Sequence, residues 1–435
     1  MALGGGTFVT QNKVLPGTYV NFVSAASANA ALSERGISTI PLVFNWGEPG
    51  KVTEVTAGDM QKNSVRLFGY DYTAPELRPL RELFLNSHTV YIYRMGTGGV
   101  AASNDYGTVR YPGSRGNDIT VSVAENPDDS TLKDITVYLD GARVSSQTVA
   151  GAADLVDDDF IIYDKTGALA QTAGTPMSGG TDPAVTNADY QTYLDLMEGY
   201  SFNAMGCPSD DPAVKSLFTA YTKRLRDEQG VKFQCVTYDN AADYEGVVNV
   251  MNRVTDENEE GYSMIYWTTG VIAGTEVNKS ALNRIYDGEY TVDTSHTQSQ
   301  LTEAIKTGKF AFHRVGTDVR VLSDINSMVT VTLEKGEVFK ENQTIRVIDQ
   351  IANDIAVIFN TRYLGIVPND NAGRVSLWAD IVRHHRQLQD IRAIEDFDSE
   401  DVTVEPGDTK RSVLVRDLVK PVNAMAQLYM IVTVA

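Results

Sequence analysis

The residue types able to do chemistry are few in this sequence, and their spacing matches no catalytic pattern. Cys207 and Cys235 lie in or next to apolar stretches without a C-x-x-C partner, which indicates small buried side chains instead of nucleophiles. His384 and His385 are adjacent, and neighbours on a helix point about 100° apart, which disfavours a shared metal ion. We expect a packed or interfacial histidine pair.

An acidic triplet and a glycine-rich loop are also candidates for chemistry, and neither fits a known motif. The triplet Asp157–Asp159 lacks the spaced oxygens and the glycine of a calcium loop, so a solvated turn is expected. The loop Gly96–Gly99 follows an apolar stretch, as a phosphate loop does, but no helix is expected after it. The common nucleotide, hydrolase and zinc-protease motifs are absent, although a triad assembled in space leaves no motif. We therefore expect no catalytic residue, no metal and no cofactor.

The elements that position these residues must form several domains. The chain has 435 residues, of which 42% are hydrophobic and 22% charged, close to the averages of globular proteins. The formal net charge of −20 repels nucleic acid and anionic membrane surfaces, so neither is an expected partner. We expect no signal peptide and no membrane span, and the two cysteines fit a reducing cytoplasm.

The N-terminal part, residues 1–28, combines a glycine run, a short β-prone stretch at 18–23 and a run of small residues. It has too little apolar surface for a core of its own. From composition alone, two interpretations remain: an arm that leaves the subunit, and an edge strand of the chain's own sheet.

Residues 29–102 predict an α/β segment, with a buried strand in 36–47, a helix in 75–87 and a strand in 88–96. Residues 103–183 change character, because short β-branched runs alternate with Pro, Asp and Gly turns. An inserted all-β domain is predicted there.

Residues 184–322 predict an α/β layer with a mainly parallel sheet, since amphipathic helices alternate with apolar strands. The acidic stretch 256–260 is expected to be a solvated loop. The helices are predicted in 188–200 and 213–230, and the strands in 202–208, 231–238 and 262–270.

Residues 323–435 predict two helices and three β-prone pieces, of which the first two form a hairpin across Pro406–Asp408. The second helix, after Gly373, carries Arg383 and Arg386 on its polar side. The first helix is expected to bury one face, made of Ile345, Ile348, Ala352, Ile355, Ile358 and Phe359. The buried side of the second is expected to hold Val375, Leu377, Trp378, Ile381, Val382 and Leu388.

Four stretches, in this order, resemble the tail sheath family of contractile phages and phage-derived bacteriocins, in the form found with Gram-positive hosts. They span the chain: LPGTYVNF (15–22) with ERGISTIPLVFNWG (34–47), VRYPGSRGNDITVSV (109–123), TIRVIDQIANDIAVIF (344–359) and KPVNAMAQLYMIVTV (420–434).

This resemblance implies an α/β multidomain fold. An N-terminal arm leads to a β-sandwich insertion, a subtilisin-like α/β domain without protease activity, and an α+β C-terminal domain with exchanged terminal strands. It implies a subunit of a helical contractile sheath that drives a tail tube through the host envelope. The implied partners are further copies of the chain, the tail tube protein, and the baseplate and tail terminator proteins, in a virion assembled in the host cytoplasm.

The resemblance also implies which residues mediate assembly. Strand exchange falls on Thr18, Tyr19, Val20, Asn21 and Phe22, and on Leu428, Tyr429, Met430, Ile431 and Val432. For the second set the alternative is a central strand of the chain's own sheet, since both of its faces are apolar.

A tube-facing role falls on Arg383 and Arg386, and a solvated helix face is the alternative. Two other functions stay open: a cytoplasmic α/β enzyme built on residues 187–322, and another phage tail or baseplate protein. The sequence fits a DNA-carrying phage and a headless bacteriocin equally well.

Overall fold

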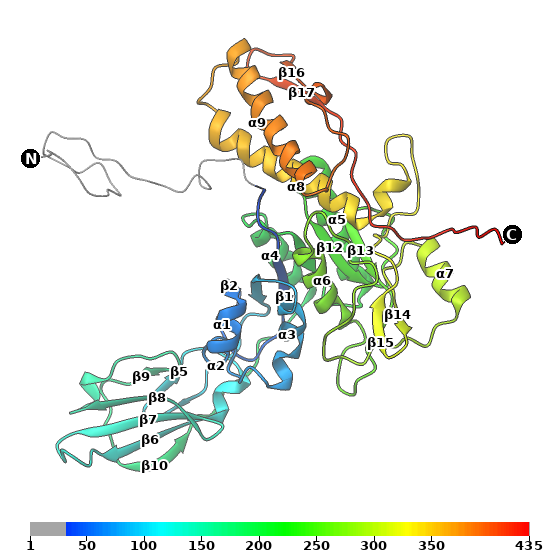
Figure 1. The fold of residues 1–435 in the computed structure, drawn as a ribbon. Coiled ribbons are helices and arrows are strands. Elements are labelled where there is room, and N and C mark those ends of the chain that lie inside the picture. The colour runs from blue at the N-terminus through cyan, green and yellow to red at the C-terminus, as the bar shows by residue number, and fades with distance from the viewer. Residues whose placement is uncertain (1–31, 435) are drawn as a thin grey trace, which may run out of the picture. The chain divides into compact units, whose positions relative to one another are not determined.

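The computed structural model describes residues 32–434, and it has an α/β multidomain fold, as predicted (Figure 1). The chain divides into two compact units. The large unit comprises residues 35–349 and 423–434, and the C-terminal unit comprises residues 32–34 and 350–422.

A six-stranded sheet organises the large unit. Its strands are β1 (Ile37–Leu42), β2 (Val52–Thr56), β3 (Thr89–Arg94), β11 (Ala204–Gly206), β12 (Gln234–Tyr238) and β13 (Val247–Val250). The spatial order is β13-β12-β11-β1-β3-β2, and all neighbours are parallel except β2 with β3. The prediction of a mainly parallel sheet is confirmed.

Helices bury both faces of this sheet. Along β3, Val90 and Ile92 enter one core, whereas Tyr93 enters a second core on the opposite face. The first core includes residues of α3 (Arg78–Phe84) and α6 (Met264–Gly274), and the second includes residues of α4 (Asn187–Met197) and α5 (Pro212–Lys223). Sheets covered on both sides have apolar residues throughout, which explains why these strands were readable in the sequence.

The strand predicted in 262–270 is wrong, because this stretch lies in α6. Every residue from Met264 to Ala273 is buried, so the helix has no polar face and its sequence carries no helical period. A short, fully buried apolar run fits a strand and a buried helix equally well. Packing decided the outcome: a Cβ on Gly274 would lie 1.8 Å from the Asn86 carbonyl oxygen, so the helix approaches the loop after α3 closely.

The inserted β domain is a sandwich whose two sheets share one core. One sheet has the order β10-β6-β7-β8 and the other β4-β5-β9. The strands are β4 (Ser103–Asn104), β5 (Gly107–Val109), β6 (Ile119–Glu125), β7 (Lys133–Leu139), β8 (Ala142–Val149), β9 (Ile161–Tyr163) and β10 (Thr172–Pro176).

The stretch 109–123 fastens this sandwich to the α/β part. Arg115 donates from Nε to the Gly69 carbonyl over 2.8 Å, and its guanidinium stacks on the Tyr70 ring. Gly113 has φ +142°, and a Cβ there would lie 2.0 Å from the Asn45 carbonyl oxygen, so only glycine fits.

The other elements of the large unit are short. They are α1 (Ala57–Lys62), α2 (Ser64–Phe68), α7 (Gln298–Lys306), β14 (Phe312–Val315) and β15 (Asp318–Val321). Capping boxes at Thr56 and Thr297 begin α1 and α7, each with a side chain at the third helical residue bonding back to the cap.

The C-terminal unit packs two helices on a hairpin. Its elements are α8 (Asn342–Ile358), which crosses the boundary between the units, a π-helical turn (Phe359–Tyr363), α9 (Asn371–Asp390), β16 (Val402–Pro406) and β17 (Val413–Asp417). Asp370 caps α9 by accepting from the Gly373 amide. The predicted hairpin is confirmed, whereas Val375, placed on the buried side by sequence, is 54% exposed.

The expectation that α8 buries only one face is wrong for its first half, because residues 342–347 are buried on all sides. Their polar side chains have partners within the large unit. Asn342 bonds Asp324 and Gln234, and Arg346 donates to the Lys279 carbonyl and pairs with Asp324. Buried polar groups are tolerated when they are hydrogen-bonded.

The same turn of α8 carries a buried ion pair. Asp349 accepts from both terminal nitrogens of Arg226, over 2.6 and 2.8 Å, and both side chains are almost fully buried. This bidentate contact joins α8 to the π-helical turn after α5 (Arg224–Glu228).

Replacing Asp349 by Asn should lower the free energy of unfolding by about 3–5 kcal/mol, because the Arg226 charge would remain buried without its counter-ion. Glu405→Gln is the matched control, since its pair with Arg416 is exposed and is worth at most about 1 kcal/mol. Urea unfolding followed by circular dichroism measures both. Equal losses in the two variants would contradict this assignment.

Candidate assembly surfaces

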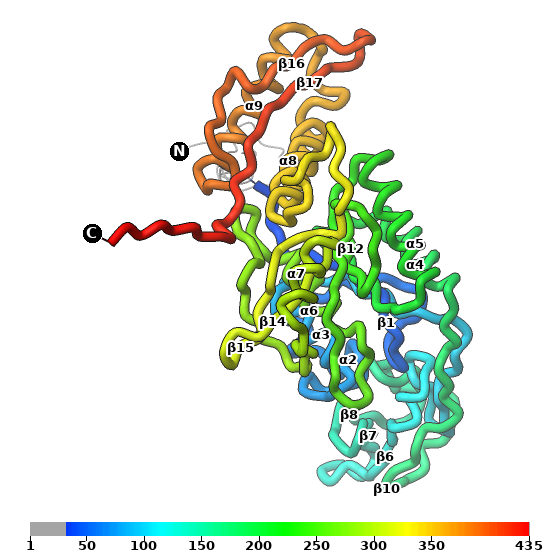
Figure 2. Tube along the Cα trace, turned by 90° about the vertical axis from the view of Figure 1, so that its right-hand side faces the viewer, coloured from blue at the N-terminus to red at the C-terminus, as the bar shows by residue number. Residues whose placement is uncertain are grey.

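The C-terminal segment exposes a run of apolar side chains. Residues 423–434 belong to no helix or strand, and Figure 2 shows them as an extended trace. Between Leu428 and Val432, side-chain exposure runs from 68% to 96% on both faces. A stretch of this kind has the composition of a strand but no strand partner among the described residues.

The root of this segment is fixed within the large unit. The Asn423 side chain accepts from the Thr344 hydroxyl over 3.1 Å, and the Ala424 amide donates to Gln343 over 2.9 Å. No backbone hydrogen bond to another described residue follows after Ala424. The five C-terminal residues assigned to strand exchange, 428–432, therefore lie beyond a fixed root. Thr18, Tyr19, Val20, Asn21 and Phe22 lie outside the described residues.

The β16–β17 hairpin offers unpaired edges in the C-terminal unit. The two strands pair antiparallel from Val402↔Asp417 to Pro406↔Val413 and, among residues 32–434, pair with no other strand. One part of the hairpin rests on α9, where Trp378 Nε1 donates to the Val402 carbonyl over 3.0 Å. A two-stranded sheet of this kind has a row of free amide and carbonyl groups along each edge.

Helix α9 exposes the two arginines assigned to the tube-facing surface. Arg383 and Arg386 are both exposed, one turn apart, as the sequence predicts. Arg383 pairs with Asp380 over 3.1 Å, and Arg362 pairs with the same carboxylate. Arg386 makes no ion pair with a described residue, so its charge is fully available to a partner.

The histidine pair is packed, in agreement with the sequence-based expectation. His384 and His385 are both fully buried, and their Nδ1 atoms lie 3.2 Å apart. Each Nε2 meets a carboxylate: Asp354 for His384 at 2.9 Å, and Asp417 for His385 at 2.7 Å. Pattern reading missed this arrangement. Its one signal was an acidic residue, Asp354, on the helix face of Ile358.

The sequence candidates for chemistry are all structural in the described chain. Cys207 and Cys235 are free and fully buried, and burial raises the pKa of Cys235 to about 12 and that of Cys207 well above its usual value. The Asp158 carboxylate accepts from the amides of Phe160 and Ile161, so it shapes a turn. The loop Gly96–Gly99 leads into the sandwich through isolated bridges at Thr97 and Val100.

Across residues 32–434, no cluster of three or more His, Cys, Asp or Glu side chains is placed to hold a metal ion. In the same residues, no helix has the length and apolar character needed to cross a bilayer.

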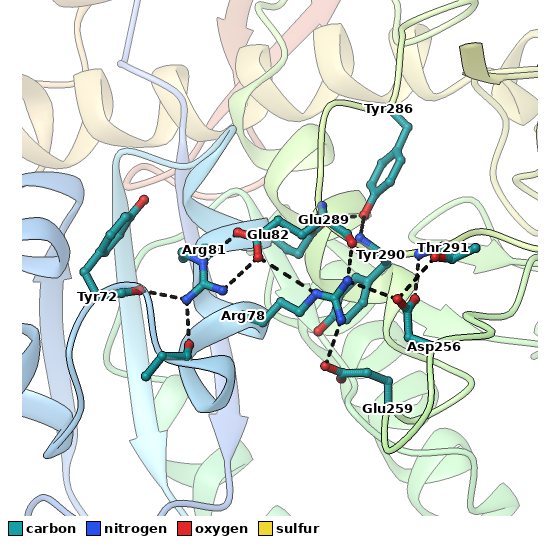
Figure 3. A network of polar contacts seen from close by, with 11 residues as sticks. Tyr72, Arg78, Arg81, Glu82, Asp256, Glu259, Tyr286, Glu289, Tyr290 and Thr291 are labelled. Atoms are coloured by element: carbon teal, nitrogen blue, oxygen red, sulfur yellow. Dashed lines mark hydrogen bonds and ion pairs between the residues drawn. The ribbon is translucent and has the colours of Figure 1, made fainter. Parts of the chain in front are cut away.

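A polar network, also missed by sequence reading, ties α3 to two loops of the large unit (Figure 3). Arg78 pairs with Asp256 at 3.2 Å and with Glu259 at 3.3 Å. Arg81 donates from two nitrogens to the Glu289 carboxylate. The expectation of a solvated 256–260 loop is therefore wrong for two of its acids, because the Arg78 guanidinium draws their carboxylates inward.

Glu82 lies at the centre of this network. It is fully buried and accepts from the Glu289 amide and, over 2.8 Å, from the Tyr286 hydroxyl. Burial raises the pKa of Glu82 to about 7, although the two hydrogen bonds act in the opposite direction.

Comparison with known proteins identifies the family. Four family models match consecutive stretches: the N-terminal region of domain III of the tail sheath protein Gp18 (35–95), and the phage tail sheath β-sandwich (96–182), central (183–327) and C-terminal (334–435) domains.

Whole-length relatives agree with these matches. The protein XkdK of the phage-like element PBSX from Bacillus subtilis (strain 168) is 34% identical, over 98% of this chain and 99% of its own length. The sheath tail protein from Desulfitobacterium hafniense is 36% identical with a TM-score of 0.81, covering 94% of this chain and 98% of that one. The sheath tail protein from Listeria innocua is 32% identical with a TM-score of 0.79, covering 92% and 95%.

An α/β multidomain fold with an inserted β-sandwich, matched along residues 35–435 by phage tail sheath domain models, defines a structural phage tail protein. The chain belongs to the phage tail sheath family and is a structural subunit of the contractile tail sheath of a virion. The enzyme proposed as an alternative on residues 187–322 is not favoured.

The Glu82 shift predicts a pH-dependent stability. Because the folded state holds this proton up to about pH 7 and an ordinary glutamate only to about 4.5, the contribution is full below pH 4.5 and is lost as pH rises to 7. Relative to Glu82→Gln, the wild-type free energy of unfolding should fall by on the order of 3 kcal/mol across that window. Urea unfolding of both proteins at several pH values measures it, with the exposed Glu303→Gln as control. A difference between wild type and Glu82→Gln that does not change with pH would refute the prediction.

Proposed function

We propose that the chain polymerises around a tail tube by donating its terminal segments to the sheets of neighbouring copies. The observation that carries this proposal is the C-terminal segment, whose apolar side chains are exposed on both faces beyond a fixed root. An extended segment gains backbone hydrogen bonds and side-chain burial together when it joins a sheet edge.

The acceptor we propose is the β16–β17 hairpin of another copy. Its open edges offer the hydrogen-bonding groups that the segment lacks, and each hydrogen bond formed contributes about 0.5–1.5 kcal/mol net. Several such bonds per subunit, repeated along a helical lattice, would hold a continuous mesh. Residues Thr18–Phe22 would supply the second exchanged strand, which the β-prone sequence at 18–23 supports.

The remaining domains would serve as a rigid scaffold. We propose limits at 1–28 for the arm, 29–102 for the first α/β segment, 103–183 for the sandwich, 184–322 for a subtilisin-like α/β domain without protease activity, and 323–435 for the C-terminal domain. The four family models divide the chain in the same order, and the limit between the β-sandwich model (96–182) and the central-domain model (183–327) supports the proposed boundary at 183/184. Burial of both thiols supports a scaffold role for residues 184–322.

Contraction would be a rearrangement of subunits between two lattices, with the exchanged strands as hinges and no nucleotide consumed. In the extended lattice, the exposed Arg383 and Arg386 would meet acidic groups of the tail tube protein, through contacts weak enough to break. Baseplate and tail terminator proteins would cap the two ends of the sheath, and contraction would drive the tube through the host envelope.

Removing residues 425–435 should leave a folded chain that forms no long sheaths, because the donated strand is lost while its root remains. Removing residues 1–22 should have the same effect. Negative-stain electron microscopy shows the polymers, and circular dichroism checks the fold. Normal long sheaths from either truncated chain would disprove strand donation by that end.

Two substitutions at Ile431 test whether assembly depends on backbone hydrogen bonds of the segment or on the apolar character of its side chains. Ile431→Pro removes an amide donor from the segment and should abolish long polymers, whereas Ile431→Thr keeps the amide and the β propensity and should preserve them. Equal assembly of the two variants by electron microscopy would show that backbone pairing at this position is not required.

The charge reversals Arg383→Glu and Arg386→Glu together should weaken assembly of the extended sheath on its tube by about tenfold or more, since attraction becomes repulsion. Co-assembly with purified tubes measures the effect at low and high salt, and the loss should shrink at high salt. Arg143→Glu with Lys306→Glu makes the same change of charge at exposed sites elsewhere in the large unit and is the control. Unchanged extended-state assembly of the Arg383/Arg386 variant would refute a tube-facing role.

A further inference from the structure

A continuous chain of polar contacts runs through the C-terminal unit. It passes from Asp354 on α8 to His384 and His385 on α9, and ends at Asp417, the last residue of β17. The two imidazoles are fully buried. No feature of the assembly surfaces described above requires two buried histidines in contact.

At one end of this series of polar contacts lies Ser33, near the start of the described residues. The Asp354 carboxylate accepts from the Ser33 hydroxyl over 2.5 Å and from the Ser33 amide over 3.3 Å. Gln350 adds contacts to the Ser33 carbonyl and hydroxyl, over 3.2 and 2.7 Å. Ser33 is the second described residue, so these contacts fix the N-terminal end of the described part of the chain.

The other end holds the strand that precedes the C-terminal segment. Asp417 closes the hairpin ladder opposite Val402. The chain then runs along residues 393–395, where the Glu395 amide donates to Lys420 and the Val422 amide donates to Ala393. The histidine pair thus lies between Ser33 and β17, the strand that precedes the C-terminal segment.

Hydrogen-bond geometry fixes the number of protons on the two histidine rings of this series of contacts. Asp354 is ionised: burial raises its pKa, but hydrogen bonds from His384, Ser33 and Gln350 outweigh burial and lower the pKa below its usual value. His384 must therefore donate from Nε2. At the other ring, His385 Nε2 lies 2.7 Å from an Asp417 carboxylate oxygen, and a donor at Nε2 satisfies that contact.

At 3.2 Å, the two Nδ1 atoms can bond only if one carries a proton and the other does not. Two Nδ1 protons would face each other between two cations, and none would leave two lone pairs in contact. The arrangement thus fits three ring protons on four nitrogens, which is one imidazolium and one neutral imidazole.

We propose that His384 and His385 are positioning residues that share this single Nδ1 proton to hold α8, α9 and β17 together between Ser33 and Asp417, and that a second proton breaks the contact between the two rings. The assembly consequence rests on the strand exchange proposed above, whereas the proton count does not.

The two carboxylates next to the pair can balance a second positive charge, so the effect of a second proton falls on the contact between the two Nδ1 atoms. The titratable groups that contact the pair are Asp354 from α8 and Asp417 from β17, and the Phe397 ring packs on His385 at 5.1 Å. On α9 itself, Asp380 is already paired with Arg362 and Arg383. Asp396, next to Phe397, is paired with Lys420 at 3.5 Å. A second imidazolium must therefore break the Nδ1 contact.

The first test compares assembly over about pH 5 to 8, the range in which histidine changes charge. Wild-type polymer should fall about tenfold or more towards the acid end, since one added proton breaks the pair. In His385→Gln, an amide can still donate to Asp417 but cannot take up a proton, so this variant should polymerise at neutral pH and lose the acid sensitivity. His385→Ala, which lacks the donor, should assemble poorly at every pH.

His88→Gln removes an exposed histidine of the large unit and should keep the wild-type acid profile. An acid profile of His385→Gln identical to that of the wild type would overturn the proposal.

The second test reads the protons directly in the full-length wild-type chain. With ¹⁵N-labelled histidine, nuclear magnetic resonance at neutral pH should show three ring N–H signals from the pair, two on Nε2 and one on Nδ1. The signals are assigned by their loss in His384→Gln and His385→Gln. Two or four ring protons at neutral pH would overturn the proposal even if the variants fail to fold. Failure of strand exchange would instead appear as absence of polymer with the three signals intact.

Discussion

An extended backbone whose amide and carbonyl groups lack partners is the constraint on which this subunit depends. Residues 425–434 present apolar side chains on both faces, and the described part of their own chain covers neither the side chains nor the backbone. An exposed apolar segment of this kind is an aggregation hazard, and in the strand exchange that we propose it would pair with a sheet edge of another copy. The open hairpin β16–β17 has that complementary requirement. The hydrophobic cores of the subunit are packed within the chain, whereas its hairpin and its C-terminal segment have no further strand partner among the described residues.

Rigid attachment at the roots makes such a segment useful. In the proposed strand exchange, a strand tethered by a loose linker would carry no force between subunits, whereas one that begins at a fixed Asn423 and Ala424 would transmit displacement. The fully buried first half of α8, with Arg346 and Asp349 in paired contacts, supplies the same rigidity from within the large unit. Buried polar pairs contribute little net stability compared with apolar packing, but they accept only one geometry. We infer that this precision at the roots is what they provide.

Patterns of local origin were readable in the sequence, and those set by packing were not. The parallel strands β1, β3, β11 and β12 follow from β-branched and apolar runs, and the hairpin follows from its turn residues. Helix α6 was misread because a helix buried all round has no period, and the short strand β13 was not predicted. The His384–Asp354 and His385–Asp417 contacts join residues 30 and 32 positions apart, so no local rule finds them. The assembly role of the C-terminal segment came from resemblance, because periodicity alone fits a central strand equally well.

The two cysteines have a consequence at the scale of the whole particle. Both thiols are buried in the core between the sheet and helices α4 and α5, so none of the chain's cysteines reaches the surface. A sheath repeats each surface group once per subunit, so a single exposed thiol would become a dense array exposed to dissolved oxygen. Disulfides could then cross-link adjacent subunits and trap them in the extended or the contracted lattice. Because both thiols are buried, this route to cross-links that would block contraction is closed while a particle is stored in air.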